Sequence, residues 1–177
     1  MPMEPDEGDA QFSSGLSDFE FAHLTFAFGF LRWVEKCMEA TGLRGLTAVD
    51  ILVLHAVNLR ARGRRLSEIS MVLNVDDSHL VAYSLKKLVS AELVQIIKDG
   101  RESRYETTAL GDEACDSYRA VRRSYLVRGV RAAANAAGIN EATMLLTALT
   151  GVYDQATRLA TANSAQLTKR PPVRTKR

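Results

Sequence analysis

One face of a predicted helix near the middle of the chain carries side chains that can donate hydrogen bonds to an external partner. Over residues 77–92 the apolar side chains recur at helical spacing, which predicts an amphipathic helix. The face that needs a hydrophobic core holds Leu80, Val81, Ser84, Leu85 and Leu88. The opposite face remains available for contact and holds His79, Ala82, Tyr83 and Lys86.

The flanking residues predict a helix-turn-helix followed by a hairpin. Ser67 can cap a shorter helix that ends at Asn74-Val75-Asp76, and Asp76 or Asp77 can cap the next helix. After that helix, two β-prone runs (93–98 and 104–107) flank Asp99-Gly100, a strong hairpin signal because the turn needs positive φ. Two helices followed by a hairpin with a basic tip describe a winged helix.

This arrangement resembles the MarR family of bacterial transcription regulators, over roughly residues 20–160. The family's wing motif reads Asp-x-Arg-x-x-x-apolar-x-Leu-Thr-x-x-Gly. The chain matches it with Asp99, Arg101, Tyr105, Thr108 and Gly111, and has Thr107 where leucine is usual. The resemblance implies a mainly α fold with a small β-hairpin wing (α+β), a winged helix-turn-helix that dimerises through its N- and C-terminal helices.

The resemblance also implies that the 77–92 helix reads DNA, since the major groove admits one α-helix and distinguishes base edges there. We expect base-edge contacts from Ser78, His79 and Tyr83, and phosphate contacts from Lys86 and Lys87. By resemblance, Arg101 enters the minor groove, and Asp99 helps to hold the wing tip. Further phosphate candidates are Arg104 and the loop residues Arg64 and Arg65, which follow Arg60 and Arg62; the alternative for this loop is an ordinary charged surface.

The chain divides into five predicted segments. Residues 1–16 form a disordered acidic leader, and 17–45 an N-terminal dimerisation helix that starts at the capping box of Ser17 and Glu20. Residues 46–108 form the winged helix-turn-helix core, with a helix start at Thr47. Residues 109–163 form C-terminal dimerisation helices, the first ending at Gly138 and the last starting at Asn140; 164–177 form a basic disordered tail.

The N-terminal helix is aromatic on more than one side. All six Phe residues and the only Trp precede residue 34, and between Phe19 and Trp33 they do not keep to one stripe. A helix that is apolar nearly all round is normally buried on several sides, which favours a second subunit. The predicted dimer contacts are Phe19, Phe26, Phe30, Trp33, Leu145, Leu149 and Val152. An aromatic ligand-binding box is the alternative.

The charge distribution suits a protein that binds a polyanion, and the low cysteine content suits a protein inside the cell. The first 20 residues hold six acids and no Lys or Arg, so the remaining 157 residues carry 23 basic and 15 acidic side chains. No apolar run reaches the length of about 18 residues that spans a bilayer, and no signal peptide pattern opens the chain. Two cysteines are too few for a disulfide scaffold. We therefore expect a cytoplasmic protein without a membrane segment.

The sequence offers no catalytic, metal-binding or cofactor-binding constellation, because His23, His55 and His79 are scattered and His55 lies in an apolar run. We expect a homodimeric repressor on a pseudo-palindromic operator, with readers about 34–36 Å apart. The alternative is a dimeric winged-helix interaction module that does not bind DNA. The resemblance also implies regulation of DNA binding, either by a small aromatic effector or by oxidation of a cysteine. Cys37 and Cys115 are, however, more typical of buried packing thiols.

Overall fold

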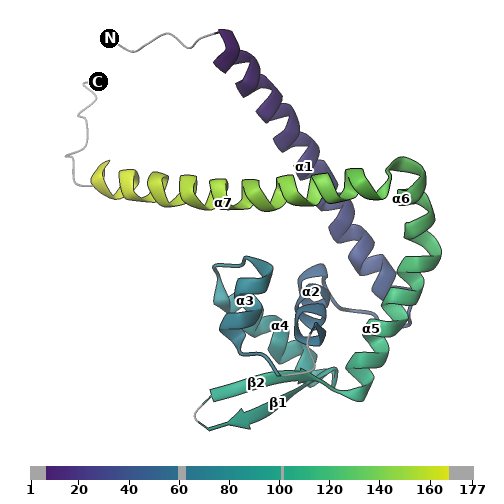
Figure 1. Ribbon diagram of the computed structural model, residues 1–177. Helices are drawn as coiled ribbons and strands as arrows, with labels where there is room; N and C mark the ends of the chain where they lie inside the picture. The colour runs from purple at the N-terminus through teal and green to yellow at the C-terminus, as the bar shows by residue number, and fades with distance from the viewer. Residues whose placement is uncertain (1–6, 60–62, 101, 168–177) are drawn as a thin grey trace, which may run out of the picture. The chain divides into compact units, whose positions relative to one another are not determined.

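The computed structural model describes residues 7–59, 63–100 and 102–167, and it divides the chain into two compact units between Leu126 and Val127. The described residues are mainly helical with one two-stranded hairpin (Figure 1), as the sequence predicted. The elements of the first unit are α1 (Glu7–Glu39), α2 (Ala48–Asn58), α3 (Leu66–Leu73), α4 (Ser78–Ser90), β1 (Val94–Asp99), β2 (Glu102–Thr107) and α5 (Ala109–Arg122). A π-helical turn, η1 (Arg123–Val127), spans the division, and α6 (Arg128–Ala133) and α7 (Ala136–Leu167) follow it.

The short helix α2 lies at the centre of the first unit. It begins at the predicted helix start, Thr47, with a capping box: the Asp50 carboxylate accepts from the Thr47 backbone N–H at 2.8 Å, and the Thr47 hydroxyl accepts from the Asp50 N–H at 3.3 Å. Most of its side chains are buried, because α1, α3, α4, α5 and β2 all pack against it. α2 therefore holds the other elements of this unit in place.

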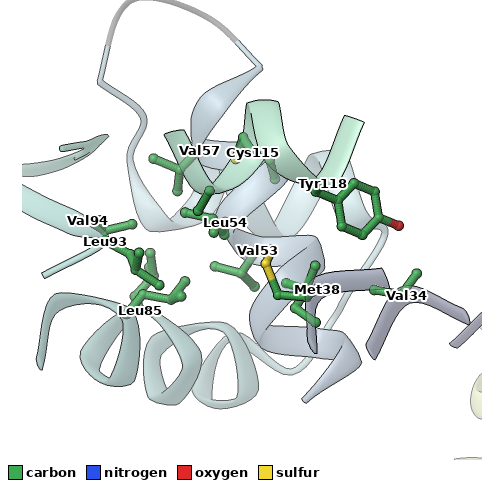
Figure 2. Close-up of a cluster of buried hydrophobic side chains, with 14 of the residues drawn as sticks. Val34, Met38, Val53, Leu54, Val57, Leu85, Leu93, Val94, Cys115 and Tyr118 are labelled. Carbon is green, nitrogen blue, oxygen red and sulfur yellow. The ribbon is translucent and has the colours of Figure 1, made fainter. Parts of the chain in front are cut away.

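Figure 2 shows the core that forms around α2. Val34 and Met38 enter it from α1, Val53, Leu54 and Val57 from α2, and Leu85 from α4. Leu93 and Val94 enter from the start of the hairpin, and Cys115 and Tyr118 from α5. Burial of this apolar surface stabilises the unit at roughly 25 cal/mol per Å² removed from water.

The helix-turn-helix forms with local capping much as predicted. α3 is capped at Arg65 rather than at Ser67, because the Glu68 carboxylate accepts from the Arg65 N–H at 2.8 Å. Asn74 adopts a left-handed conformation (φ +51°) that ends the helix. The Asp77 carboxylate then accepts from the His79 N–H at 2.9 Å and caps α4.

The hairpin pairs β1 with β2 in antiparallel register from Val94 opposite Thr107 to Asp99 opposite Glu102, with Gly100 (φ +62°) in the turn. Arg64 adds one antiparallel bridge to Tyr105 on the other edge of β2. Glu92, between α4 and β1, adopts φ +58°, a conformation that favours glycine. A Cβ atom on Gly111 would lie 2.0 Å from the Leu93 carbonyl oxygen, so the close approach of α5 to the hairpin requires glycine there.

The N-terminal helix is longer than predicted. α1 begins at Glu7, and the Ser17 hydroxyl donates to the Ser13 carbonyl at 3.1 Å instead of capping a helix start. The prediction of a disordered leader is therefore wrong for residues 7–16, whereas residues 1–6 lie outside the described part of the chain. Among the α1 side chains that the structure describes, only Val34, Cys37 and Met38 are buried in the core of this unit.

The C-terminal helices differ from the prediction in their boundaries. The helix after Thr108 ends at Ala133, and Ala134 is extended (φ −150°). The Asn135 side chain then accepts from the Gly138 N–H at 2.8 Å, so Gly138 lies in the first turn of α7 and Asn140 lies inside that helix. α7 continues to Leu167, beyond the predicted limit of residue 163. The rest of the predicted basic tail, residues 168–177, lies outside the described residues.

Candidate nucleic-acid interface

The predicted reader face of α4 is open to solvent. Ser78, His79, Tyr83 and Lys86 are all exposed, whereas Val81, Ser84, Leu85 and Leu88 are buried against the core. Leu80 was expected to face inward but is 42% exposed, so it borders the reader face. The structure thus brings the three predicted base-reading residues and one lysine together on one surface.

Lys87, which was predicted to contact phosphates together with Lys86, pairs instead with an acid of α2. Its ammonium nitrogen is 2.6 Å from the Asp50 carboxylate, which is 1% exposed. Burial alone would raise the pKa of Asp50, but hydrogen bonds from Lys87, the Thr47 backbone and Ser84 outweigh burial and hold that pKa below its usual value. This geometry does not support a phosphate contact by Lys87, whose charge already has a partner.

The loop before α3 is bound to the wing through the arginines that the sequence assigned to phosphates. Arg64 is only 8% exposed, and Arg65 Nε lies 2.6 Å from a carboxylate oxygen of Glu102. Arg104 Nη1 donates to the Gly63 carbonyl at 2.9 Å. The Gly63 N–H in turn donates to the Glu106 carboxylate at 3.0 Å. These three arginines therefore join loop and wing, and Arg64 has little surface left for a ligand.

The side chains of four residues named in the sequence analysis are not described by the structure. Arg60, Arg62 and Arg101 lie outside the described residues, and the side chain of Asp99 is not described either. Their expected roles at the loop and at the wing tip stay predictions.

A polar cluster that the sequence did not reveal ties the wing to α5. The Asp112 carboxylate accepts from the Thr107 hydroxyl at 2.5 Å and from the Asn58 amide at 2.7 Å. The Arg119 guanidinium donates to the side-chain oxygen of Asn58. Thr107 is the residue that replaces leucine in the wing motif. Its hydroxyl was the one feature of the sequence that could have indicated a hydrogen bond at this position.

Burial shifts the pKa values of three titratable groups in and beside the core. Burial raises the pKa of the Cys37 thiol, which donates to the Tyr118 carbonyl at 3.5 Å, and burial raises the pKa of Cys115 to about 11. Burial, assisted by the nearby Arg119 charge, lowers the pKa of His55 to about 4. The His55 ring packs edge-on against Tyr118, with 4.5 Å between ring centroids. Both cysteines are buried, as predicted, and His55 is a half-buried histidine at the boundary of the core.

The described residues contain no group of three or more His, Cys, Asp or Glu side chains that could hold a metal ion. None of the helices in the described ranges is long and apolar enough to cross a membrane.

The residues predicted to form a dimer are largely uncovered within each unit. On α1, Phe26 and Phe30 are exposed and stack with ring centroids 6.4 Å apart, and Phe19 and Trp33 are partly buried. On α7, Leu145 and Val152 are exposed and Leu149 is partly buried. Large apolar side chains at such positions mark surfaces that a partner covers.

Comparison with known proteins agrees with this geometry. Residues 46–111 match the family model of a winged helix DNA-binding domain. No curated protein sequence matches the chain. Among solved structures, the chain is similar to a MarR family transcription regulator, with a TM-score of 0.67, 16% identity, and coverage of 84% of this chain and 97% of the other.

Two staphylococcal structures are also similar. AbfR of Staphylococcus epidermidis has a TM-score of 0.69 and 14% identity over 85% of this chain and 99% of its own. MarR of Staphylococcus aureus, in complex with salicylate and kanamycin, has a TM-score of 0.62 and 18% identity over 82% of this chain and 97% of its own. The chain therefore has the winged-helix fold of MarR regulators, as its wing motif predicted.

Proposed function

We propose that this chain is a MarR-type transcription regulator that binds a pseudo-palindromic double-stranded DNA operator as a homodimer and represses transcription. The observation that carries the proposal is the exposed face of α4 within a winged helix DNA-binding domain. A helix of this kind fits the major groove, where its first turns meet base edges.

Local charge supports the same orientation of the reader. Lys86 is an exposed cation on the outer face of α4, while the neighbouring Lys87 is neutralised by Asp50. A cation that faces the partner contributes affinity by releasing condensed counterions from phosphates. Arg101 at the wing tip completes the contact in this proposal, on the basis of the wing motif alone.

The apolar surfaces of α1 support a homodimer. Phe12, Phe26 and Phe30 lie on one side of this helix, and Phe21 and Phe28 lie on another, at helical spacing. All five rings are exposed in the single chain. An apolar helix with two open faces is stable in water only when other helices cover it, and a second copy supplies them.

A small aromatic effector is part of the proposal. The Staphylococcus aureus relative was solved with salicylate and kanamycin. Salicylate suits apolar and aromatic surroundings, which α1 supplies in this chain. The effector acts by binding one arrangement of the dimer better than the other and so lowering the affinity for DNA.

The proposal is tested by fluorescence anisotropy of the purified protein with DNA from upstream of its own gene and with a random duplex, at several salt concentrations. Tight, salt-dependent binding that prefers the upstream DNA supports it. Lys86→Gln is expected to weaken binding to both duplexes and to reduce the salt slope by about one. Lys36→Gln is the matched control, because Lys36 lies at the end of α1 and pairs with Glu39 at 2.7 Å.

Absence of binding to either duplex at low salt would contradict the proposal. A dimer without DNA binding would then leave the interaction module as the function. Two ion pairs favour that alternative: Arg65 pairs with Glu102, and Lys87 pairs with Asp50. Both pairs neutralise basic side chains that were predicted to contact DNA phosphates.

A further inference from the structure

α4 lacks the side chains that make two-point contacts with most bases. From Ser78 to Ser90 it contains no arginine, asparagine, glutamine, aspartate or glutamate. Bidentate contacts to adenine and acceptance from the cytosine amino group rely on those residue types, and guanine is read by arginine or lysine, of which α4 has lysine alone. The donors on the predicted reader face are Ser78, His79, Lys86 and the single hydroxyl of Tyr83.

Two neighbouring charges do not supply the missing contacts. The Asp77 carboxylate accepts from the His79 backbone N–H at 2.9 Å and is committed to capping α4. The Lys87 ammonium is committed to Asp50 at 2.6 Å. The reader therefore meets a base pair with few strong hydrogen-bonding groups.

The exposed face instead carries two neighbouring apolar groups. Tyr83 is 70% exposed and Leu80 is 42% exposed, and side chains three residues apart on a helix lie next to each other. Thymine is the base that presents a methyl group in the major groove, and apolar side chains recognise it by contact. Covering Tyr83 and Leu80 with thymine methyls removes apolar surface from water on both sides.

We infer that α4 recognises thymine through its C5 methyl group, with the Tyr83 ring and the Leu80 side chain as the contacting surface. This inference rests on the proposed function, because it requires α4 to lie in the major groove. Tyr83 and Leu80 determine base preference, whereas Lys86 contributes affinity that does not depend on the base.

The test uses the full-length protein and duplexes selected by it from a random pool at low salt. Each thymine of the selected site is replaced singly by deoxyuridine, which removes the methyl group and leaves base pairing and phosphates unchanged. Because the burial of one methyl group is lost, binding is expected to be about fourfold weaker for each contacted thymine that is replaced. Thymines outside the contact are expected to show no change.

Two variants separate methyl recognition from general affinity. The double variant Leu80→Ser/Tyr83→Ser is expected to bind thymine and deoxyuridine duplexes alike, and circular dichroism checks that these two exposed substitutions leave the helices folded. Lys86→Gln is expected to weaken both duplexes equally and to keep the fourfold difference. If every deoxyuridine substitution leaves wild-type affinity unchanged, the inference is overturned while the proposed function stands. If no duplex is selected at all, both fail.

Discussion

The ammonium nitrogen of Lys87 lies 2.6 Å from the carboxylate of Asp50, and this ion pair joins the last turn of α4 to the first turn of α2. Asp50 also accepts from the Thr47 N–H and so caps α2 with the same carboxylate. One buried acid thereby fixes both the start of the central helix and the position of the reader helix against it.

Adjacent lysines on α4 are therefore expected to respond differently to substitution. Lys87→Met leaves the Asp50 carboxylate without its charged partner and should lower the free energy of unfolding by about 1–3 kcal/mol. Lys86→Met, at an exposed position, should change it by less than about 0.5 kcal/mol. Urea unfolding followed by circular dichroism measures both values. Equal effects of the two substitutions would show that the ion pair does not stabilise the fold.

The stability of the protein is expected to fall in mild acid because of His55. Its pKa is about 4 in the folded protein and about 6.5 in the unfolded chain, so the unfolded chain binds more protons between these values. The stabilising contribution is complete above pH 6.5 and is lost as the pH falls towards 4, by up to about 3 kcal/mol.

Denaturant unfolding at a series of pH values from 7.5 to about 4.5, compared between wild type and His55→Leu, measures this contribution. The variant is expected to lose less stability over that range than wild type does. Parallel curves for the two proteins would assign the acid sensitivity to other groups.

Glu92 is expected to be replaceable by glycine with a gain in stability. A non-glycine residue at φ +58° is sterically unfavourable, and its removal should raise the free energy of unfolding by about 0.5–1 kcal/mol after the extra chain entropy of glycine. The hydrogen bond from the Thr108 hydroxyl is kept, because it goes to the Glu92 backbone carbonyl. Ala91→Gly is the control, since Ala91 has φ −86° and should only lose stability.

Hydrogen peroxide is expected to leave DNA affinity unchanged. Oxidation proceeds through the thiolate, and burial raises the pKa values of both Cys37 and Cys115 above that of an ordinary thiol. A thiol-reactive dye should label neither cysteine in the native protein and both in denaturant. Labelling of a native thiol together with peroxide-induced loss of DNA binding would establish redox control instead.

The sequence predicted those elements whose signals are local. The helix start at Thr47, an aspartate cap on α4 and the turn at Gly100 each depend on residues a few positions apart, and all three formed. The start of α1 was missed because its first turns contain Ser and Gly in an acidic stretch, a composition typical of disorder. The alanine-rich end of α6 was missed because alanine favours a continuing helix.

The exposed face of α4 could be predicted from helical periodicity, but the ion pairs that basic side chains form inside the protein could not. Lys87 and Asp50 are separated by 37 positions in the sequence, and Arg65 contacts Glu102 only because the loop lies beside the wing. A basic residue looks the same in a sequence whether its partner is a phosphate or a buried acid. Three-dimensional structure was needed to distinguish Lys86 from Lys87.

The buried hydrophobic core runs from Val34 to Tyr118, and α7 contributes none of the described buried side chains. The helix-turn-helix and wing thus pack on a hydrophobic core to which α7 adds no described buried side chain. Substitutions at exposed positions of α7 are therefore expected to leave the packing around α4 unchanged, and substitutions on the exposed face of α4 are expected to leave α7 folded.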